Sequence, residues 1–218
     1  MQSKFRQLGA CLAVLFLSAP LFAAGPTVDR IGALSAAAAS DNLKKAVEDT
    51  GYRATLDDGW TADFWFARVL STTAKESAAA LYPVLSNGEF VAVVRFTKGF
   101  SDFRGQAVSS GFYTLRYQYL PQDANHMGVS PNPDFLLAIP MADDPNPTDS
   151  LPFKRLVTLS AKSTGTAHPA VIAMATAAAP ASFSKDDQGM TVLTVEVPTA
   201  TVGRTIKLGI VVKGQATQ

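Results

Sequence analysis

Apolar and polar residues alternate with a period of two along most of the chain, which is typical of half-buried β-strands. The segments 52–56 and 60–70 alternate on either side of an acidic turn that ends in glycine. The segments 81–85 and 89–96 flank an Asn-Gly pair, the dipeptide that two-residue hairpin turns favour. The pattern therefore predicts two strand-turn-strand units in the first half of the chain.

Further strands are expected in the second half of the chain. The pattern predicts them at 112–120, 135–139, 171–174, 191–197 and 205–212. The first of these is rich in aromatic and branched residues, which fit a pleated surface. The 135–139 segment is apolar at every position, as expected for a strand that is covered on both faces.

Two segments have helical spacing instead. The first spans 40–51, with a serine or an aspartate as its cap and a glycine at its end. The second begins near Asp149 or Ser150 and ends at Gly165. Both helices are short, so we expect them at the periphery of the protein.

Many short strands and few helices predict a fold class. We expect a mainly β protein, an antiparallel two-sheet β-sandwich with two short peripheral helices. Residues 25–51 are expected to form an N-terminal helical segment, and residues 52–218 to form the β-sandwich domain. Residues 1–24 have a different character.

The segment 1–24 has the parts of a secretory signal peptide. Lys4 and Arg6 form a basic start, residues 8–17 are apolar, and small residues precede a cleavage point at the end of the segment. The apolar run is shorter than the ~20 residues that a membrane-spanning helix needs. The leader therefore predicts a bacterial protein that is exported by the Sec route to the periplasm or the medium. We expect no stable membrane anchor after cleavage.

Cys11 lies within the leader and is the only cysteine of the chain. We therefore expect a disulfide-free mature protein without thiolate catalysis or thiolate metal sites. Loss of the leader also removes Lys4 and Arg6, so that the formal charge changes from +1 to −1. This charge balance does not favour nucleic acid as a partner.

The sequence lacks the motifs of several enzyme classes. It has no Gly-x-Ser-x-Gly elbow, no His-Glu-x-x-His zinc helix, no phosphate-binding glycine loop and no dinucleotide fingerprint. A zinc site built from three histidines is excluded, because the chain has two. No activated nucleophile can be named, so the sequence favours a non-catalytic role and a hydrolase ranks last.

The two histidines lie in polar loops next to predicted strands, where binding groups concentrate. The candidate ligand-binding residues are Asp123, Asn125, His126, Met127 and His168. If the two loops meet, His126 and His168 could hold a divalent metal ion. Asp123 or Asp134 would add a carboxylate, and the thioether of Met127 would suit copper. The alternative is that each histidine only bonds to a carbonyl or carboxylate of its own loop.

A second candidate site is a set of aromatic residues. They are Trp60, Phe64, Trp65, Phe66, Tyr113, Tyr117 and Tyr119. Exposed rings on one face of a sandwich could stack against sugar rings or a partner protein. Core packing is the favoured alternative for most of them. Trp65 differs from the others, because its place in the alternation is opposite to that of Phe64 and Phe66.

Three segments in the middle of the chain resemble an uncharacterised family of exported bacterial β-sandwich proteins. They are Asp102–Gly105, Gly111–Tyr117 and Asp123–Gly128, and the segments that begin at Asp134 and His168 agree with them. The resemblance implies a β-sandwich fold and export, but no reaction and no catalytic residue. Because both histidine loops fall within matching segments, the resemblance also favours these loops as the site.

These observations lead to one expected function and one alternative. We expect an exported, non-catalytic β-sandwich that binds a small molecule or a protein through the loops around His126 and His168. No cofactor is expected for this role. The alternative is a periplasmic metal-binding protein that uses the same two histidines, with Asp123, for copper or zinc.

Overall fold

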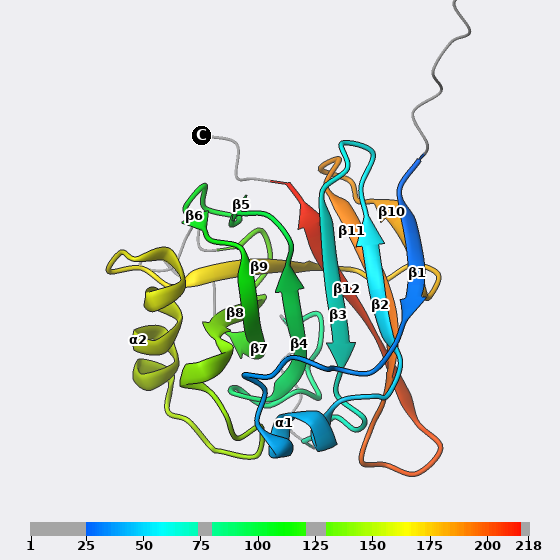
Figure 1. The fold of residues 1–218 in the computed structure, drawn as a ribbon. Coiled ribbons are helices and arrows are strands. Elements are labelled where there is room, and N and C mark those ends of the chain that lie inside the picture. Colours follow the sequence, from blue (N-terminus) through cyan, green and yellow to red (C-terminus); the bar gives the residue numbers. More distant parts are fainter. Residues whose placement is uncertain (1–24, 74–79, 121–129, 215–218) are drawn as a thin grey trace, which may run out of the picture.

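The computed structural model describes residues 25–73, 80–120 and 130–214, and β-strands predominate among them (Figure 1). The main strands are β1 (Thr27–Ile31), β2 (Gly51–Thr55), β3 (Thr61–Phe66), β4 (Phe90–Phe96), β7 (Gly111–Tyr119), β8 (Asp134–Pro140), β9 (Ala170–Ala175), β10 (Ser182–Lys185), β11 (Thr191–Pro198) and β12 (Thr205–Lys213). A separate hairpin consists of β5 (Phe100–Ser101) and β6 (Ala107–Val108). The helices are α1 (Asp41–Ala46), the short 3-10 helix η1 (Met141–Asp143) and α2 (Phe153–Thr164).

The main strands form one ten-stranded sheet in the order β1-β2-β3-β4-β7-β8-β9-β12-β11-β10, and neighbouring strands are antiparallel. The edge strands β1 and β10 contact each other, so that the sheet is nearly closed into a barrel. The prediction of a mainly β, antiparallel protein with two helices is confirmed. The two stacked sheets of a sandwich are not confirmed, because the described strands run continuously from one edge to the other.

Several predicted elements differ in detail. Residues 25–51 contain strand β1 as well as α1, and the helix is shorter than the segment predicted for it. The segment 81–85 is not a strand and lies at one end of the barrel instead. The second predicted helix is α2, which ends at Gly165 in the left-handed conformation (φ +65°) that favours glycine. Within the described residues, no helix combines the length and apolar character needed to cross a bilayer.

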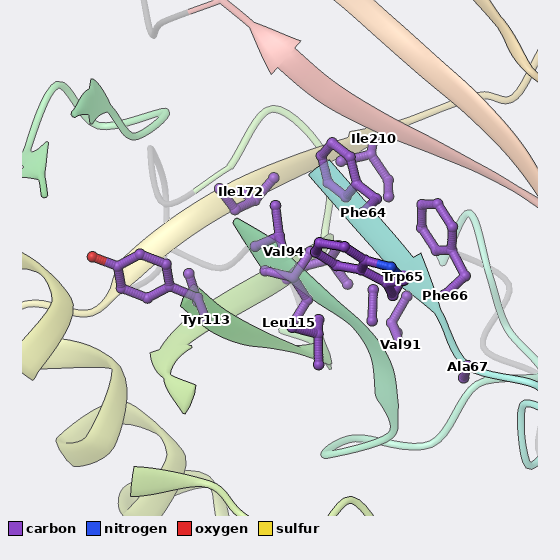
Figure 2. Close-up of a cluster of buried hydrophobic side chains, with 14 of the residues drawn as sticks. Phe64, Trp65, Phe66, Ala67, Val91, Val94, Tyr113, Leu115, Ile172 and Ile210 are labelled. Carbon is purple, nitrogen blue, oxygen red and sulfur yellow. The ribbon is translucent and has the colours of Figure 1, made fainter. Parts of the chain in front are cut away.

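The barrel interior is filled by apolar side chains from several strands (Figure 2). Phe64 and Phe66 on β3 stack with their ring centroids 5.7 Å apart. Leu115 on β7, Ile172 on β9 and Ile210 on β12 pack in the same cluster. Bulky side chains from strands that are distant in sequence therefore hold the sheet in its curved form.

Trp65 lies on the other face of β3 from Phe64 and is nevertheless buried. Its ring stacks on Phe112 with a centroid distance of 6.3 Å, and its indole N–H donates to the carbonyl oxygen of Gly32 at 2.9 Å. The chain between β1 and α1 thus covers this face of the sheet. Both faces of β3 belong to the core, which explains why aromatic residues occupy both odd and even positions of this strand.

Helix α2 covers the face of β8 that points away from the barrel interior. Leu156 and Leu159 on α2 lie in one buried cluster with Phe135, Leu137 and Ile139 of β8. The alternate residues of β8 belong to the interior cluster. This double cover explains why the predicted strand is apolar at every position.

One end of the barrel is closed by α1 and by the segment that begins at residue 80. The Tyr82 hydroxyl donates to the carbonyl oxygen of Ala175 on β9 and accepts from the N–H of Gly209 on β12. A Cβ atom at position 209 would overlap the carbonyl of Ala175, so the close approach of the two strands requires glycine there. Burial raises the pKa of Tyr82 to about 12, so the hydroxyl keeps the proton that it donates.

Asp134, at the start of β8, fixes the same segment. Its buried carboxylate accepts from the N–H groups of Leu81 and Tyr82 and from the hydroxyl of Tyr117 at 2.6 Å. Three donors on one carboxylate account for its burial without a cation. Asp134, which the sequence offered as a metal ligand, is therefore used to close this end of the barrel.

Candidate functional site

The opposite end of the barrel, which is the upper end in the view of Figure 1, carries a cleft, and we call this end the mouth. The turn between β2 and β3, the chain after β4 and the end of β12 meet there. The residues that line the mouth are Leu56, Asp58, Trp60, Phe100, Ser101, Val212, Lys213 and Gly214, and they enclose a cleft of about 400 Å³. Apolar side chains from three separate elements thus share one concave surface.

Aromatic rings form one wall of the mouth. The ring centroid of Trp60 lies 5.9 Å from that of Phe96 and 6.2 Å from that of Phe100. The two phenylalanine rings are 4.1 Å apart. Phe96 is buried, whereas Trp60 and Phe100 are partly exposed. The wall therefore offers free ring surface to an apolar molecule.

Local hydrogen bonds hold Trp60 in this position. Its backbone N–H donates to the carboxylate of Asp58 at 3.0 Å, and its carbonyl oxygen accepts from the N–H of Leu56. Lys213 on β12 bonds to Asp58 at 2.7 Å and lies 3.4 Å from Asp57. The hydrogen bond with Lys213 lowers the pKa of Asp58, and the same bond raises the pKa of Lys213. The turn and β12 are thus linked by a charged pair at the rim of the mouth.

A narrow cavity of about 30 Å³ lies between the mouth and the core. Phe64, Leu115, Ile172 and Ile210 form its floor. These side chains leave room for little more than a water molecule. A ligand would therefore rest in the mouth, above a packed interior.

The β5–β6 hairpin fills a gap in the barrel wall next to the mouth. Strands β9 and β12 pair at two positions and then diverge. In the gap, the N–H of Val171 on β9 donates to the carboxylate of Asp102, and the carbonyl of Val171 accepts from the N–H of Phe103. The Asp102 carboxylate also accepts from the backbone N–H groups of Arg104 and Gln106. The hairpin thus takes the place of a paired strand, and Asp102 has a structural role.

Trp60 lines the mouth, but its indole N–H is buried. It is shielded from solvent and has no hydrogen-bond partner in the part of the chain that the structure describes. A buried donor without a partner costs about 1–3 kcal/mol. An acceptor oxygen on a bound molecule would remove this cost.

No family model, curated protein or solved structure matches the chain. The resemblance to exported bacterial β-sandwich proteins therefore stays a prediction. Four of the expected binding residues, Asp123, Asn125, His126 and Met127, lie outside the described residues. His168 is described, and it is exposed in the loop between α2 and β9.

The described residues that flank the two histidine loops lie at opposite ends of the sheet. His168 precedes β9 at the mouth end, next to the β5–β6 hairpin. The chain enters residues 121–129 after Tyr119 and leaves them before Asp134, and these two residues pair at the closed end. Among the described residues there is no group of three or more His, Cys, Asp or Glu side chains that could hold a metal ion. The two-histidine metal site stays a prediction, since one of its histidines is not described.

Most aromatic residues of the second candidate set are core residues. Phe64, Trp65, Phe66, Tyr113 and Tyr117 are buried. Trp60 is the member of the set that reaches the mouth. Sequence reasoning missed Phe100 and Val212, because apolar residues at strand ends follow the same alternation as core residues.

Proposed function

We propose that the chain is an exported, non-catalytic β-barrel protein that binds a small, largely apolar molecule in the mouth. The observation that carries this proposal is the open cleft with partly exposed Trp60 and Phe100 on its wall. A carbonyl or ether oxygen on the ligand would add to the affinity where it reaches the buried indole N–H of Trp60, which lacks an acceptor among the described residues.

The difference between the two barrel ends supports this proposal. At the closed end, Tyr82 and Asp134 fix the chain beneath the interior. At the mouth end, an apolar wall is combined with a few charged groups, Asp58 and Lys213, at the rim. Binding sites for small molecules are typically concave and mostly apolar, with a few polar groups that set the orientation of the ligand.

The place of action is proposed from the sequence. Residues 1–24 have the basic start, the apolar run and the small-residue end of an export signal. The lone cysteine of the chain, Cys11, lies within the same segment. These features support a disulfide-free protein that works in the periplasm or outside the cell.

The test uses prodan, a neutral naphthalene dye with one carbonyl oxygen, whose emission shifts to the blue in apolar surroundings. We expect saturable binding to the full mature chain. Phe100→Ala removes part of the wall and should weaken binding about tenfold, which corresponds to about 1.4 kcal/mol. Val202→Ala is the matched control, because Val202 is 98% exposed and lies between β11 and β12 at the closed end.

A second variant tests the role of the indole N–H. Trp60→Phe keeps an aromatic ring but removes the donor, so prodan should bind more weakly while naphthalene, which has no oxygen, should bind as before. Equal prodan affinity in the wild type, in Phe100→Ala and in Val202→Ala would show that the mouth is not the site.

A further inference from the structure

A second pocket lies at the closed end, and we call it the Glu89 pocket. It is formed by the chain after β3, the turn before β4 and residues 147–150, and its volume is about 460 Å³. Phe90 lines this pocket, whereas the Phe96 ring packs against Trp60 and Phe100 of the mouth. Phe90 and Phe96 are the two ends of β4, about 20 Å apart at the rise of a β-strand. The Glu89 pocket is therefore separate from the mouth.

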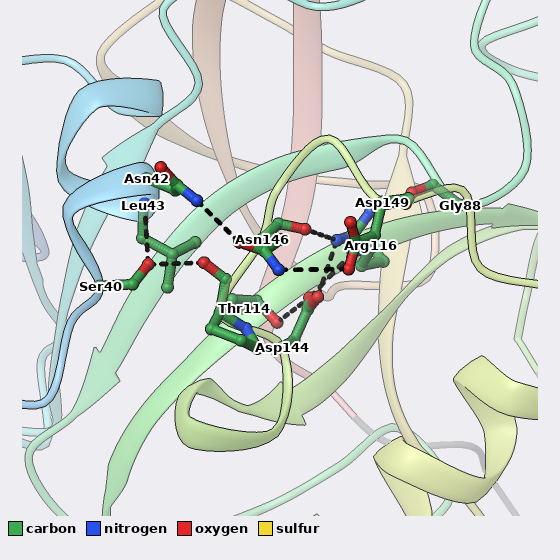
Figure 3. A network of polar contacts seen from close by, with 10 residues as sticks. Ser40, Asn42, Leu43, Gly88, Thr114, Arg116, Asp144, Asn146 and Asp149 are labelled. Carbon is green, nitrogen blue, oxygen red and sulfur yellow. Dashed lines mark hydrogen bonds and ion pairs between the residues drawn. The ribbon is translucent and has the colours of Figure 1, made fainter.

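Arg116 gives the pocket a fixed wall (Figure 3). Its buried guanidinium bonds twice to the carboxylate of Asp144, with N–O distances of 2.7 and 2.8 Å. Its other N–H groups donate to the carbonyl oxygens of Gly88, Asn146 and Asp149. Because a guanidinium has five N–H groups, Arg116 has no donor left for a ligand. Its charge is matched by Asp144.

Arg68, the other cation of the pocket wall, is engaged as well. Its Nε–H donates to the carbonyl oxygen of Lys45. Its terminal nitrogens lie 2.5 Å from a carboxylate oxygen of Asp49 and 3.6 Å from one of Glu48. An anion that entered the pocket would have to compete with both carboxylates.

Glu89 is a half-buried acid that has no ion pair with any described residue. Its Oε1 atom accepts from the N–H of Ser71 at 2.7 Å. Burial raises the pKa of Glu89, and the hydrogen bonds from Ser71 and the more distant charge of Arg116 lower it by less. Asp149 adds an exposed carboxylate, which is 3.5 Å from the side-chain amide of Asn146. The pocket therefore carries negative charge that its own cations do not match.

We propose that the Glu89 pocket binds an organic ammonium group, with the Oε2 atom of Glu89 as its counter-ion. An ammonium group brings three N–H donors, and the hydroxyls of Ser86 and Thr148 in the pocket wall are further acceptors for them. The bound cation gives the half-buried carboxylate an opposite charge at short range, where the surrounding protein screens the attraction less than water does. The volume admits a lysine side chain or a short polyamine. This site is independent of ligand binding at the mouth.

The probe is n-butylammonium chloride, added to the ¹⁵N-labelled mature protein. The amide resonance of Ser71 reports on the site directly, because this N–H bonds to Glu89. We expect a saturable shift of that resonance with butylammonium and none with n-butanol, which has the same chain without the charge. Glu89→Gln should weaken butylammonium binding at least about tenfold. Glu196→Gln is the matched control, because it makes the same change in net charge at an exposed position on β11.

Two results would overturn the proposal. One is equal butylammonium affinity in Glu89→Gln and Glu196→Gln. The other is a Ser71 shift with sodium acetate in place of butylammonium, which would indicate an anion at Arg68. If Glu89→Gln does not fold, the comparison of butylammonium with n-butanol on the wild-type protein decides the question. Prodan binding at the mouth is expected to be unchanged in Glu89→Gln, so failure of one proposal is distinguishable from failure of the other.

Discussion

Gln118 is a fully buried amide whose removal should stabilise the protein. It lies on β7 opposite Phe135 of β8. Within the described chain, neither its Oε1 nor its Nε2 atom has a hydrogen-bond partner. Substitution by leucine removes both polar atoms and keeps a side chain of similar size. We therefore expect Gln118→Leu to unfold less readily than the wild type.

The size of the effect follows from the cost of the unpaired amide. A buried polar group without a partner costs about 1–3 kcal/mol, and an apolar side chain of the same shape does not carry that cost. We therefore expect the free energy of unfolding to rise by about 2 kcal/mol. For a chain of this length, each kcal/mol raises Tm by about 2–4 °C, so Tm should increase by about 4–8 °C.

The assay is urea unfolding, followed by circular dichroism, with calorimetry for Tm. Thr114→Val is the matched control on the same face of β7, because Thr114 is also fully buried but its hydroxyl donates to Asp144 at 2.6 Å. This control should lose about 1–2 kcal/mol, since the buried carboxylate of Asp144 keeps its bonds to Arg116 but loses the one from the Thr114 hydroxyl. The two substitutions should thus change the free energy of unfolding in opposite directions. Loss of stability in Gln118→Leu would refute the reasoning and indicate that an ordered water satisfies the amide.

Three further predictions concern other buried groups. Burial raises the pKa of Glu89, so the folded chain binds a proton at this carboxylate more tightly than the unfolded chain does. The charged form of Glu89 therefore lowers the free energy of unfolding at neutral pH. This loss disappears as the pH falls below the ordinary carboxyl range. Glu89→Gln should therefore raise the free energy of unfolding at pH 7 more than at pH 4, and equal gains in urea titrations at the two pH values would contradict this. Gly209→Ala should lower Tm measurably in a thermal melt, because the new Cβ would overlap the carbonyl of Ala175, and an unchanged Tm would show that β9 and β12 can separate without cost. Arg116→Met should cost about 3–5 kcal/mol in urea unfolding, because it leaves the buried charge of Asp144 unpaired, whereas a loss below about 1 kcal/mol would mean that water reaches this carboxylate.

The alternation of residues predicted most of the longer strands, because each of these carries its pattern locally. It did not predict the barrel, since strand order depends on contacts between segments that are distant in sequence. The pairing of β9 with β12 is one such contact, and the only sign of it in the local sequence is the glycine at position 209, which the close approach of the two strands requires. The strands β1 and β10 were missed because they lie at the sheet edges and have mostly polar or partly exposed residues.

The candidate site was harder to predict than the fold. His126 and His168 were predicted as the site because histidine is a common ligand-binding residue, whereas the mouth consists mainly of apolar residues that resemble core residues in the sequence. Trp60 and Phe100 differ from core aromatics because they are partly exposed at the mouth, where segments distant in sequence meet. Glu89 follows a turn like many solvated acids, and its burial results from the loop that Arg116 fixes.

The near-closure of the barrel has a consequence for the order in which the protein is made. Strand β1 is among the first described residues of the chain, and the strand that it meets, β10, follows about 150 residues later. During synthesis, the free edge of β1 therefore has no β10 to contact until most of the chain has been produced. Free strand edges are sites where β proteins associate with each other. Rapid contact of β1 with β10, once the whole chain is present, would shorten the interval in which this edge is exposed.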